Sequence, residues 1–176
     1  FSKVLPTVAS RCFKVKFEAL SSDEIANIMM KTFGFDAPSS RTLGWIGSSV
    51  AIDIFSSAGL CLKCRDMACE FILTIRDLLK SLDFVDRVEP ANLGIFCDML
   101  VMVLTDVLFL KNGIEDIINA DKRDVLQKTA KMLNAVAVVT SLSFLTQVKK
   151  YSYLHVNLGL ALKSMLVKIH PMISLP

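Results

Sequence analysis

The sequence is short of the residues that build loops and of the residues that carry charge. Its 176 residues include only seven glycines and five prolines, which argues against a loop-rich or fibrous protein. Charged residues make up 21% and apolar residues 53% of the chain, and the mean hydropathy is +0.51. Such a chain buries enough apolar surface to offset the entropy lost on folding, so disorder is excluded. The length fits one ordinary domain or two small ones.

Sequence motifs of common enzyme classes are also missing. The chain has no HExxH zinc-protease motif, no GxSxG nucleophile elbow and no phosphate-binding P-loop. Neither of its two histidines, His155 and His170, has a carboxylate or nucleophile partner at motif spacing. We interpret His155 as a surface or capping residue. The sequence therefore predicts no catalytic activity from this chain alone.

Two apolar stretches decide how the high hydropathy is interpreted. The longest stretch without charge, residues 132–148, is only 17 residues long and carries several polar side chains. The stretch Leu93–Leu110 contains Asp98 and Asp106, which are costly in a lipid-facing helix. Both stretches therefore predict buried helices rather than membrane spans. Phe1-Ser2-Lys3 is not followed by the apolar region of a signal peptide, and a start at Phe suggests a fragment of a longer protein.

Three of the five cysteines follow the spacing Cys61-x2-Cys64-x4-Cys69. This spacing allows a metal site or a redox site, but a zinc ion would need a fourth ligand, and both histidines lie far along the chain. The three cysteines also fall within a strongly helical pattern, where a cysteine commonly serves as a small buried hydrophobe. We therefore predict no structural metal. Reduced thiols indicate a cytoplasmic protein.

Charge is distributed unevenly along the chain, although its net value is only +3. Residues 1–16 carry four basic and no acidic residues, whereas residues 18–121 carry 8 basic and 16 acidic residues. Residues 122–176 carry 8 basic residues and one acidic residue. This asymmetry fits a face that binds a polyanion, and it fits neighbouring solvated faces equally well. No run of basic residues with interleaved aromatics predicts a dedicated nucleic-acid surface.

Helical periodicity dominates after residue 20. Ser21 and Glu24 form a capping box, and the helix that follows should run to about Phe33 and end at Gly34. A short second helix should start at Pro38 and Ser39 and end near Gly44 or Gly47. A third should occupy Ser48–Ser57 and end at Gly59. The sequence therefore predicts a small bundle of three short helices.

Longer helices are predicted in the rest of the chain. Apolar residues from Leu60 to Leu82 recur at three- and four-residue steps and indicate one long amphipathic helix. A second should run from Pro90 to Asn112-Gly113. A third should cover about Lys122 to Val148, with Asn119 or Asp121 as its cap, and Asn157 should cap a last helix that Pro171 stops. Long helices with short links predict an antiparallel bundle of four or five helices.

The opening of the chain differs from the remainder. Residues Phe13–Phe17 alternate apolar and basic side chains, which predicts a β-strand. A single strand cannot form a sheet, so we expect it to be the last strand of a domain that lies upstream. Ser10-Arg11-Cys12 stands just before it, preceded by Leu5-Pro6-Thr7. This order resembles the Ser-Arg-Cys motif of AAA+ clamp loaders, which closes the nucleotide-binding domain and leads into a helical lid.

Further stretches resemble the delta prime type of clamp-loader subunit of bacterial DNA polymerase III. They are Leu43-Gly44-Trp45-Ile46-Gly47, similar to a Gly-Ser-x-Gly segment; Thr105–Gly113 with Ile118–Asp121, similar to Arg-Asp-Leu-Leu, Lys-x-Gly and Asn-x-Asp; and His155–Lys163, similar to the signature of the last helix. The departures, none of which removes a helix or a cap, are Trp45 for Ser, Thr105 for Arg, His155 for Asn and Lys163 for Glu. ATPase subunits of the family carry a sensor arginine where this chain has Gly47, which favours delta prime over gamma/tau.

The resemblance implies an all-α chain with three parts. Residues 1–17 would end the AAA+ domain with a remnant strand, residues 18–59 would form a three-helix lid, and residues 60–176 would form a four- to five-helix collar used for oligomerisation. Arg11 would be an arginine finger acting in trans, with Ser10 and Cys12 supporting its loop. This fragment would bind no cofactor, because neighbouring subunits hold the ATP.

The role implied by the resemblance is that of a stator in the pentameric ring that loads the sliding clamp onto primed DNA during replication. The chain would contact gamma/tau and delta subunits through its collar, and the clamp and DNA through the whole complex, with no membrane partner. It would belong to the DNA-directed DNA polymerase III complex, a nucleotidyltransferase, without catalysing the reaction. The alternatives are a gamma/tau-type ATPase subunit and an unrelated helical adaptor.

Overall fold

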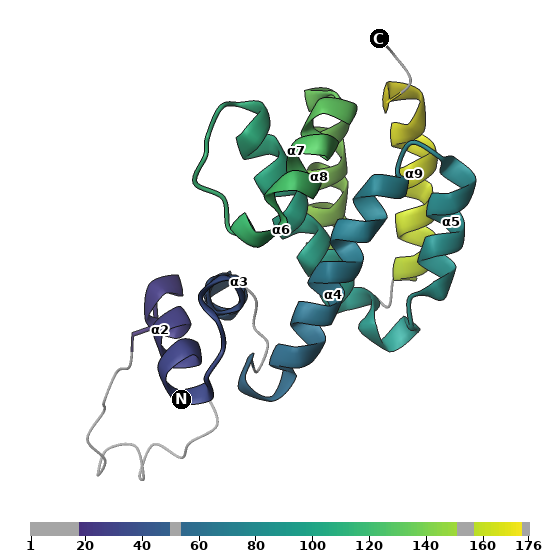
Figure 1. Ribbon diagram of the computed structural model, residues 1–176. Coiled ribbons are helices and arrows are strands. Elements are labelled where there is room, and N and C mark those ends of the chain that lie inside the picture. Colours follow the sequence, from purple (N-terminus) through teal and green to yellow (C-terminus); the bar gives the residue numbers. More distant parts are fainter. Residues whose placement is uncertain (1–17, 50–53, 151–156, 174–176) are drawn as a thin grey trace, which may run out of the picture.

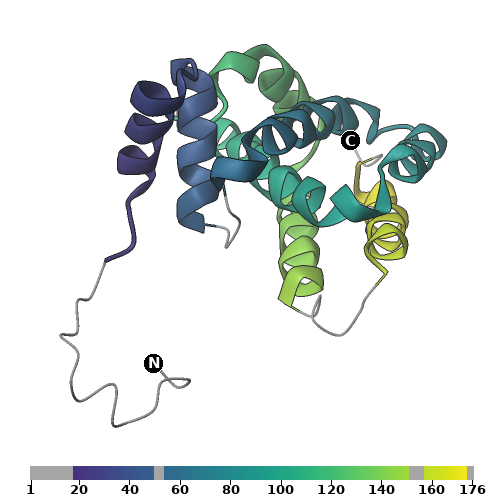
Figure 2. The ribbon, with the colours of Figure 1, turned by 90° about the horizontal axis from the view of Figure 1, so that it is seen from below.

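The computed structural model describes residues 18–49, 54–150 and 157–173, in which every regular element is an α- or 3₁₀-helix (Figure 1). The all-helical prediction is therefore confirmed for this part of the chain. Phe13–Phe17, the expected strand, lies outside the described residues. Helices α2 and α3 lie side by side at one end of the molecule, and α4 leads from them into the bundle formed by the remaining helices (Figures 1 and 2).

Helix α2, Ser22–Phe33, begins and ends where the sequence predicts. The backbone N–H of Glu24 donates to Ser21 Oγ at 3.3 Å, and the backbone N–H of Ser21 donates to Glu24 Oε2 at 2.8 Å. These two bonds are the reciprocal pair of a capping box. Gly34 ends the helix in the left-handed conformation, at φ 72°.

Helix α3, Ala37–Ser49, packs closely on α2, and the two form a helical hairpin. The expected ends at Gly44 and Gly47 are wrong, because α3 runs through both glycines. Gly44 instead provides the close approach: a Cβ there would lie 2.3 Å from the carbonyl oxygen of Ser22. A glycine in a helix interior costs about 1 kcal/mol relative to alanine. Here the close packing of the two helix backbones, which only glycine allows, offsets that cost.

The predicted third short helix, Ser48–Ser57, is also wrong. Helix α4, Ile54–Thr74, starts inside that range and passes through Gly59 without a break. Ala58 and Cys61 on either side of Gly59 are buried, so tertiary packing holds the helix across the glycine. The N-terminal part of the described chain is therefore a two-helix hairpin followed by a long helix.

The rest of the bundle is built around α6. Its elements are α5 Leu78–Arg87, η1 Pro90–Asn92, α6 Leu93–Lys111, η2 Ala120–Lys122, α7 Arg123–Met132, α8 Ala135–Lys150 and α9 Leu158–Ile173. Helix α6 packs against α4, α7 and α8, while α9 packs on α5 and α8. Among the described helices, Pro90–Lys111 alone is long and apolar enough to cross a membrane by itself, and 61% of its apolar window is buried inside the protein. It is the central core helix of the bundle.

Two predicted long helices are each broken into two. The Leu60–Leu82 pattern is interrupted after Thr74, where the Asp77 side chain accepts from the backbone N–H of Lys80 at 3.2 Å and starts α5. The Lys122–Val148 pattern is interrupted at Asn134, whose Oδ1 accepts from the backbone N–H of Ala137 at 2.7 Å. Helices α7 and α8 meet there at 111°. Asp and Asn are strong N-caps, so each restarts a helix inside an otherwise continuous apolar pattern.

The remaining helix ends are partly as predicted. Asn112 and Gly113, the latter at φ 75°, end α6, and Asn157 caps α9 by accepting from the backbone N–H of Leu160 at 3.0 Å. Pro171 does not stop α9, which continues to the buried Ile173. Burial of the last turn outweighs the one backbone hydrogen bond that a proline removes there.

Lys111 joins the end of α6 to the corner between α7 and α8. Its Nζ donates to the carbonyl oxygens of Ala130 at 2.7 Å and Leu133 at 2.6 Å. Both carbonyls lie at the C-terminal end of α7, where a cation also interacts favourably with the helix dipole. One lysine therefore holds the corner that changes the direction of the chain.

Replacing Lys111 with methionine should lower the free energy of unfolding by about 1.5–3 kcal/mol, because two part-buried carbonyls lose a charged donor. Urea denaturation followed by circular dichroism measures this. Lys128→Met, on the exposed face of α7, is the matched control and should change stability little. Equal effects of the two substitutions would mean that Lys111 does not hold the corner.

Candidate functional site

The residues that the sequence places at a functional site are outside the described part of the chain. Ser10, Arg11 and Cys12 belong to residues 1–17; His155, interpreted from the sequence as a surface or capping residue, belongs to residues 151–156. Their predicted roles therefore stay predictions. The described helices instead bring together a different group of polar residues, several of which belong to the motifs that carry the family resemblance.

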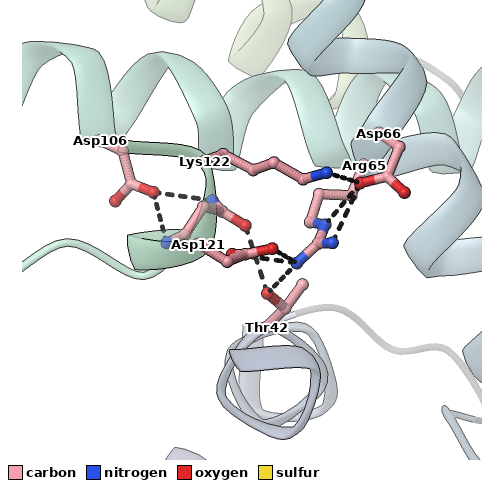
Figure 3. Close-up of polar contacts among 7 residues, drawn as sticks. Thr42, Arg65, Asp66, Asp106, Asp121 and Lys122 are labelled. Carbon is pink, nitrogen blue, oxygen red and sulfur yellow. Dashed lines mark hydrogen bonds and ion pairs between the residues drawn. The ribbon is translucent and has the colours of Figure 1, made fainter. Parts of the chain in front are cut away.

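Seven polar residues meet where the α2–α3 hairpin joins the bundle (Figure 3). We call this group the Arg65 junction; it consists of Thr42 on α3, Arg65 and Asp66 on α4, Asp106 on α6, and Asn119, Asp121 and Lys122 at η2. Its members thus come from segments far apart in the sequence. The motif stretch Thr105–Asp121 contributes three of them, Asp106, Asn119 and Asp121.

Arg65 is the centre of the junction and is only 5% exposed. Its Nη1 contacts Thr42 Oγ1 at 3.3 Å and Asp121 Oδ2 at 3.2 Å. Its Nη2 and Nε both donate to Asp66 Oδ1, at 3.0 and 3.2 Å. Lys122 Nζ reaches the same Asp66 oxygen at 3.0 Å. The planar guanidinium thus binds three elements at once, which its fixed fork of donors allows and a lysine would not.

Asp106 anchors the other end of the junction. Its Oδ1 accepts from the backbone N–H of Ile118 at 2.9 Å, and its Oδ2 accepts from both the backbone N–H and the Nδ2 of Asn119, at 2.9 and 2.7 Å. Asn119 in turn accepts from Thr42 Oγ1 at 3.2 Å. Asn119 and Asp121 were expected to cap a helix, but their side chains bind the junction instead.

The electrostatics of the junction fit an ionised network. Burial raises the pKa of Asp106, and the hydrogen bonds from Ile118 and Asn119 oppose that rise. All three partners of Asp106 are donors, so the carboxylate form satisfies every one of them. Burial alone would raise the pKa of Asp66, but its contacts with Lys122 and Arg65 lower it below the ordinary value. Amide N–H groups therefore hold the Asp106 carboxylate, whereas the cations Arg65 and Lys122 hold the Asp66 carboxylate.

The polar groups of the junction contact one another. Its members are threonine, arginine, lysine, asparagine and aspartate side chains. In the described ranges no buried side-chain nitrogen or oxygen lacks a hydrogen-bond partner. The buried polar atoms of the junction are therefore used in contacts between α3, α4, α6 and η2.

The cysteines lie in the helical core. Cys61, Cys64, Cys69 and Cys97 are buried free thiols, and burial raises the pKa of Cys69 to about 11 and that of Cys97 to about 12. Thiols with raised pKa are poor nucleophiles and poor metal ligands, since both roles need the thiolate. Across the described residues no three His, Cys, Asp or Glu side chains are grouped so that they could hold a metal ion.

Arg65 was missed by reasoning from the sequence. The signal that could have found it is its place in the apolar stripe of α4, four residues after Cys61 and four before Cys69, both of which are buried. A cation at a core position must have buried partners. Asp106 lies in the same way among the apolar residues of α6; the sequence shows it both as a charge that argues against a lipid-facing helix and as part of the motif stretch Thr105–Gly113.

Asp106→Asn keeps the shape of the side chain but turns an amide N–H₂ toward a donor. At least one buried N–H then loses its acceptor, so the free energy of unfolding should fall by about 1–3 kcal/mol. Chemical denaturation measures the change. Asp83→Asn is the matched control, because the ion pair of Asp83 with Arg87 is exposed on α5 and should contribute little. An unchanged free energy of unfolding in Asp106→Asn would contradict the role of Asp106 as an anchor.

The cysteine geometry leads to a prediction about metals. Protein purified without added chelator should contain no stoichiometric zinc by elemental analysis, and chelator should leave its thermal unfolding midpoint unchanged. Structural zinc sites stabilise folds strongly, so a bound ion would lower that midpoint on removal. One zinc per chain would overturn the interpretation of these cysteines as core residues.

Comparison with known proteins identifies the family. The family model described as DNA polymerase III, delta subunit, C terminal, matches residues 64–170, which is more than half of the chain. No curated protein and no solved structure matches. The matched range covers most of the bundle, including Arg65, Asp106 and Asn119, and leaves out the α2–α3 hairpin. The chain therefore belongs to the DNA polymerase III delta subunit family, as a helical fragment of a subunit of the replication clamp loader.

Proposed function

We propose that the chain is the lid and collar of a delta prime subunit in a bacterial DNA polymerase III clamp loader. The observation that supports a clamp-loader subunit is the family match over residues 64–170, whose description names the delta subunit and which spans most of the residues proposed as the collar. The motif order from Ser10-Arg11-Cys12 to Lys163 adds the finer assignment. Gly47 at the position of the sensor arginine favours delta prime over the gamma/tau ATPase. The subunit would act in the cytoplasm, where the replication machinery works.

Arg11 would serve ATP hydrolysis on a neighbouring subunit. As ATP is hydrolysed, negative charge is redistributed over the transferred phosphoryl group and the leaving oxygen, and an arginine placed there stabilises the transition state. Arg suits this role because it is always charged and presents a planar fork of donors. Ser10 and Cys12 would hold the loop that directs it. This chain would then contribute to the activity of the ring without binding ATP itself.

The collar would join gamma/tau and delta subunits through faces that carry little charge. Helix α8 has no charged residue from Ala135 to Val148, and its Val136 and Val139 are 63% and 51% exposed. On α9, Leu160 and Val167 are 65% and 57% exposed. Exposed apolar side chains on these two helices are available for a partner to cover. These two helices support an interface held by burial rather than by ion pairs.

The arginine-finger assignment is tested in a reconstituted loader. Arg11→Ala should lower clamp-dependent ATP hydrolysis and clamp loading. Arginine fingers contribute about 10³–10⁵ in rate, but only one of several sites depends on this subunit, so the loss for the whole ring should be smaller. Lys16→Ala, in the same basic segment, is the matched control and should leave the rate unchanged. Equal rates for Arg11→Ala and the unaltered loader would refute the finger.

The collar assignment is tested by association. The chain should bind a collar fragment of a gamma/tau subunit, and the affinity should persist at raised salt, because salt screens exposed charges but not apolar burial. Val136→Lys with Val139→Lys should weaken the complex, while Leu79→Lys, at an exposed position of α5, should not. Sedimentation at low and high salt measures this. A complex lost at high salt would show that charged faces hold it, and no complex at either salt would exclude the collar role.

A further inference from the structure

We propose that the Arg65 junction fixes the orientation of the α2–α3 hairpin on the bundle, and that Arg65 is the positioning residue of this joint. Arg65 determines the orientation of the hairpin more than it determines the free energy of unfolding of the chain. If the proposed function also holds, then Arg65 sets the orientation of the N-terminal end of α2, the described element that follows the Arg11 segment in the sequence. Only that last step rests on the proposed function.

The α2–α3 hairpin is attached to the bundle mainly through α3. Helix α2 packs on α3, and it is α3 that reaches the bundle, through α4. Among the described residues, the polar contacts between α3 and the bundle come from two neighbouring residues: Thr42 contacts Arg65 and Asn119, and Arg41 pairs with Asp116 at 2.5 Å. The Arg41 pair is exposed on both sides, so it contributes little. Thr42 therefore provides the buried polar contact of the joint.

The buried polar contact between α3 and the bundle is made by hydrogen bonds of Thr42. Apolar packing tolerates sliding of one helix over another, whereas hydrogen bonds require fixed distances and angles. Thr42 Oγ accepts from Arg65 and donates to Asn119, so both of its partners are fixed at once. Those partners are themselves held, Arg65 by Asp66 and Asp121, and Asn119 by Asp106. A rotation of α3 about its axis would break both Thr42 bonds together.

The contact between the hairpin and the bundle can loosen while the bundle stays folded. Asp66 and Asp121 have side chains that are 48% and 26% exposed, so water can solvate them when Arg65 is replaced. Asp66 would also keep Lys122 as its partner. Removing one member of an ion pair is costly when the charge left behind stays buried, and here both carboxylates left behind are partly exposed. Arg65→Met should therefore affect orientation first.

The chain carries its own reporter of this joint. Trp45 is the single tryptophan of the sequence, and it is half-buried against the hydrophobic core. It lies three residues after Thr42 on α3, so the two side chains share one face of the helix. Movement of the hairpin away from the bundle would expose the indole to solvent. Intrinsic fluorescence then reports the joint without any label.

The experiment compares Trp45 fluorescence and helix content in the 176-residue chain. Arg65→Met should shift the emission of Trp45 to longer wavelength and raise its acrylamide quenching constant, while circular dichroism and the urea midpoint stay close to those of the unaltered chain. Thr42→Val removes the same contacts from the hairpin side without changing charge and should give the same shift. Arg76→Met, at an exposed position after α4, is the control and should give none.

Two results would overturn the proposal. One is unchanged Trp45 quenching in both Arg65→Met and Thr42→Val. The other is a rise in quenching that occurs only together with loss of helix content, since this would make the junction an ordinary part of the folded core. The fluorescence test does not depend on the clamp-loader role. In a reconstituted loader, Arg65→Met should lower clamp-dependent ATP hydrolysis while collar association persists, so a failed Arg11→Ala test would leave the result on the joint intact.

Discussion

The buried guanidinium of Arg65 is the constraint on which the arrangement of helices depends. A charge taken out of water is tolerated only where partners replace its hydration, and here they come from three separate segments. Those partners are Thr42 on α3, Asp66 on α4 and Asp121 at η2. Because each must reach the same planar group, the loop after α6 and the face of α3 cannot be placed independently. Asp106 and Asn119 then fix the loop from its other side.

Several residues that carry the family resemblance have local structural roles. Gly44 allows α2 and α3 to approach, Lys111 holds the corner between α7 and α8, Asp106 and Asn119 bind each other, and Asn157 caps α9. Each role needs a particular chemistry at a particular place: no side chain, a long cation, paired hydrogen bonds, or a short acceptor. The features that support a collar interface are different in kind, since any uncharged apolar residue would serve on the exposed faces of α8 and α9. The motif residues within the described ranges therefore stabilise the fold.

The helical character of the chain and most helix starts could be predicted from the sequence. Ser21, Gly34, Asn112-Gly113 and Asn157 act locally, through hydrogen bonds and backbone conformation within a few residues, so their effects are visible without tertiary structure. The breaks at Asp77 and Asn134 were missed because both flanking helices bury their faces in the same core, which keeps the apolar period continuous. The helices across Gly59 and Pro171 were missed for the opposite reason, since packing overrides the local preference of glycine and proline to end a helix. The Arg65 junction joins residues more than fifty positions apart, and no local pattern in the sequence contains it.

Four buried thiols among the described residues make the opening of individual helices measurable. A thiol that is shielded in the folded chain reacts with a modifying reagent only when its surroundings open, so its rate of modification reports the opening of that region. Cys61, Cys64 and Cys69 lie along α4, with Cys69 one turn beyond Arg65, and Cys97 lies on the central helix α6 beside Asp98. The protein thus carries natural probes at several points along two packed helices. Mass spectrometry of the modified cysteines would rank these regions by how often they open, and would show whether the helix that bears the joint opens before the helix at the centre of the core.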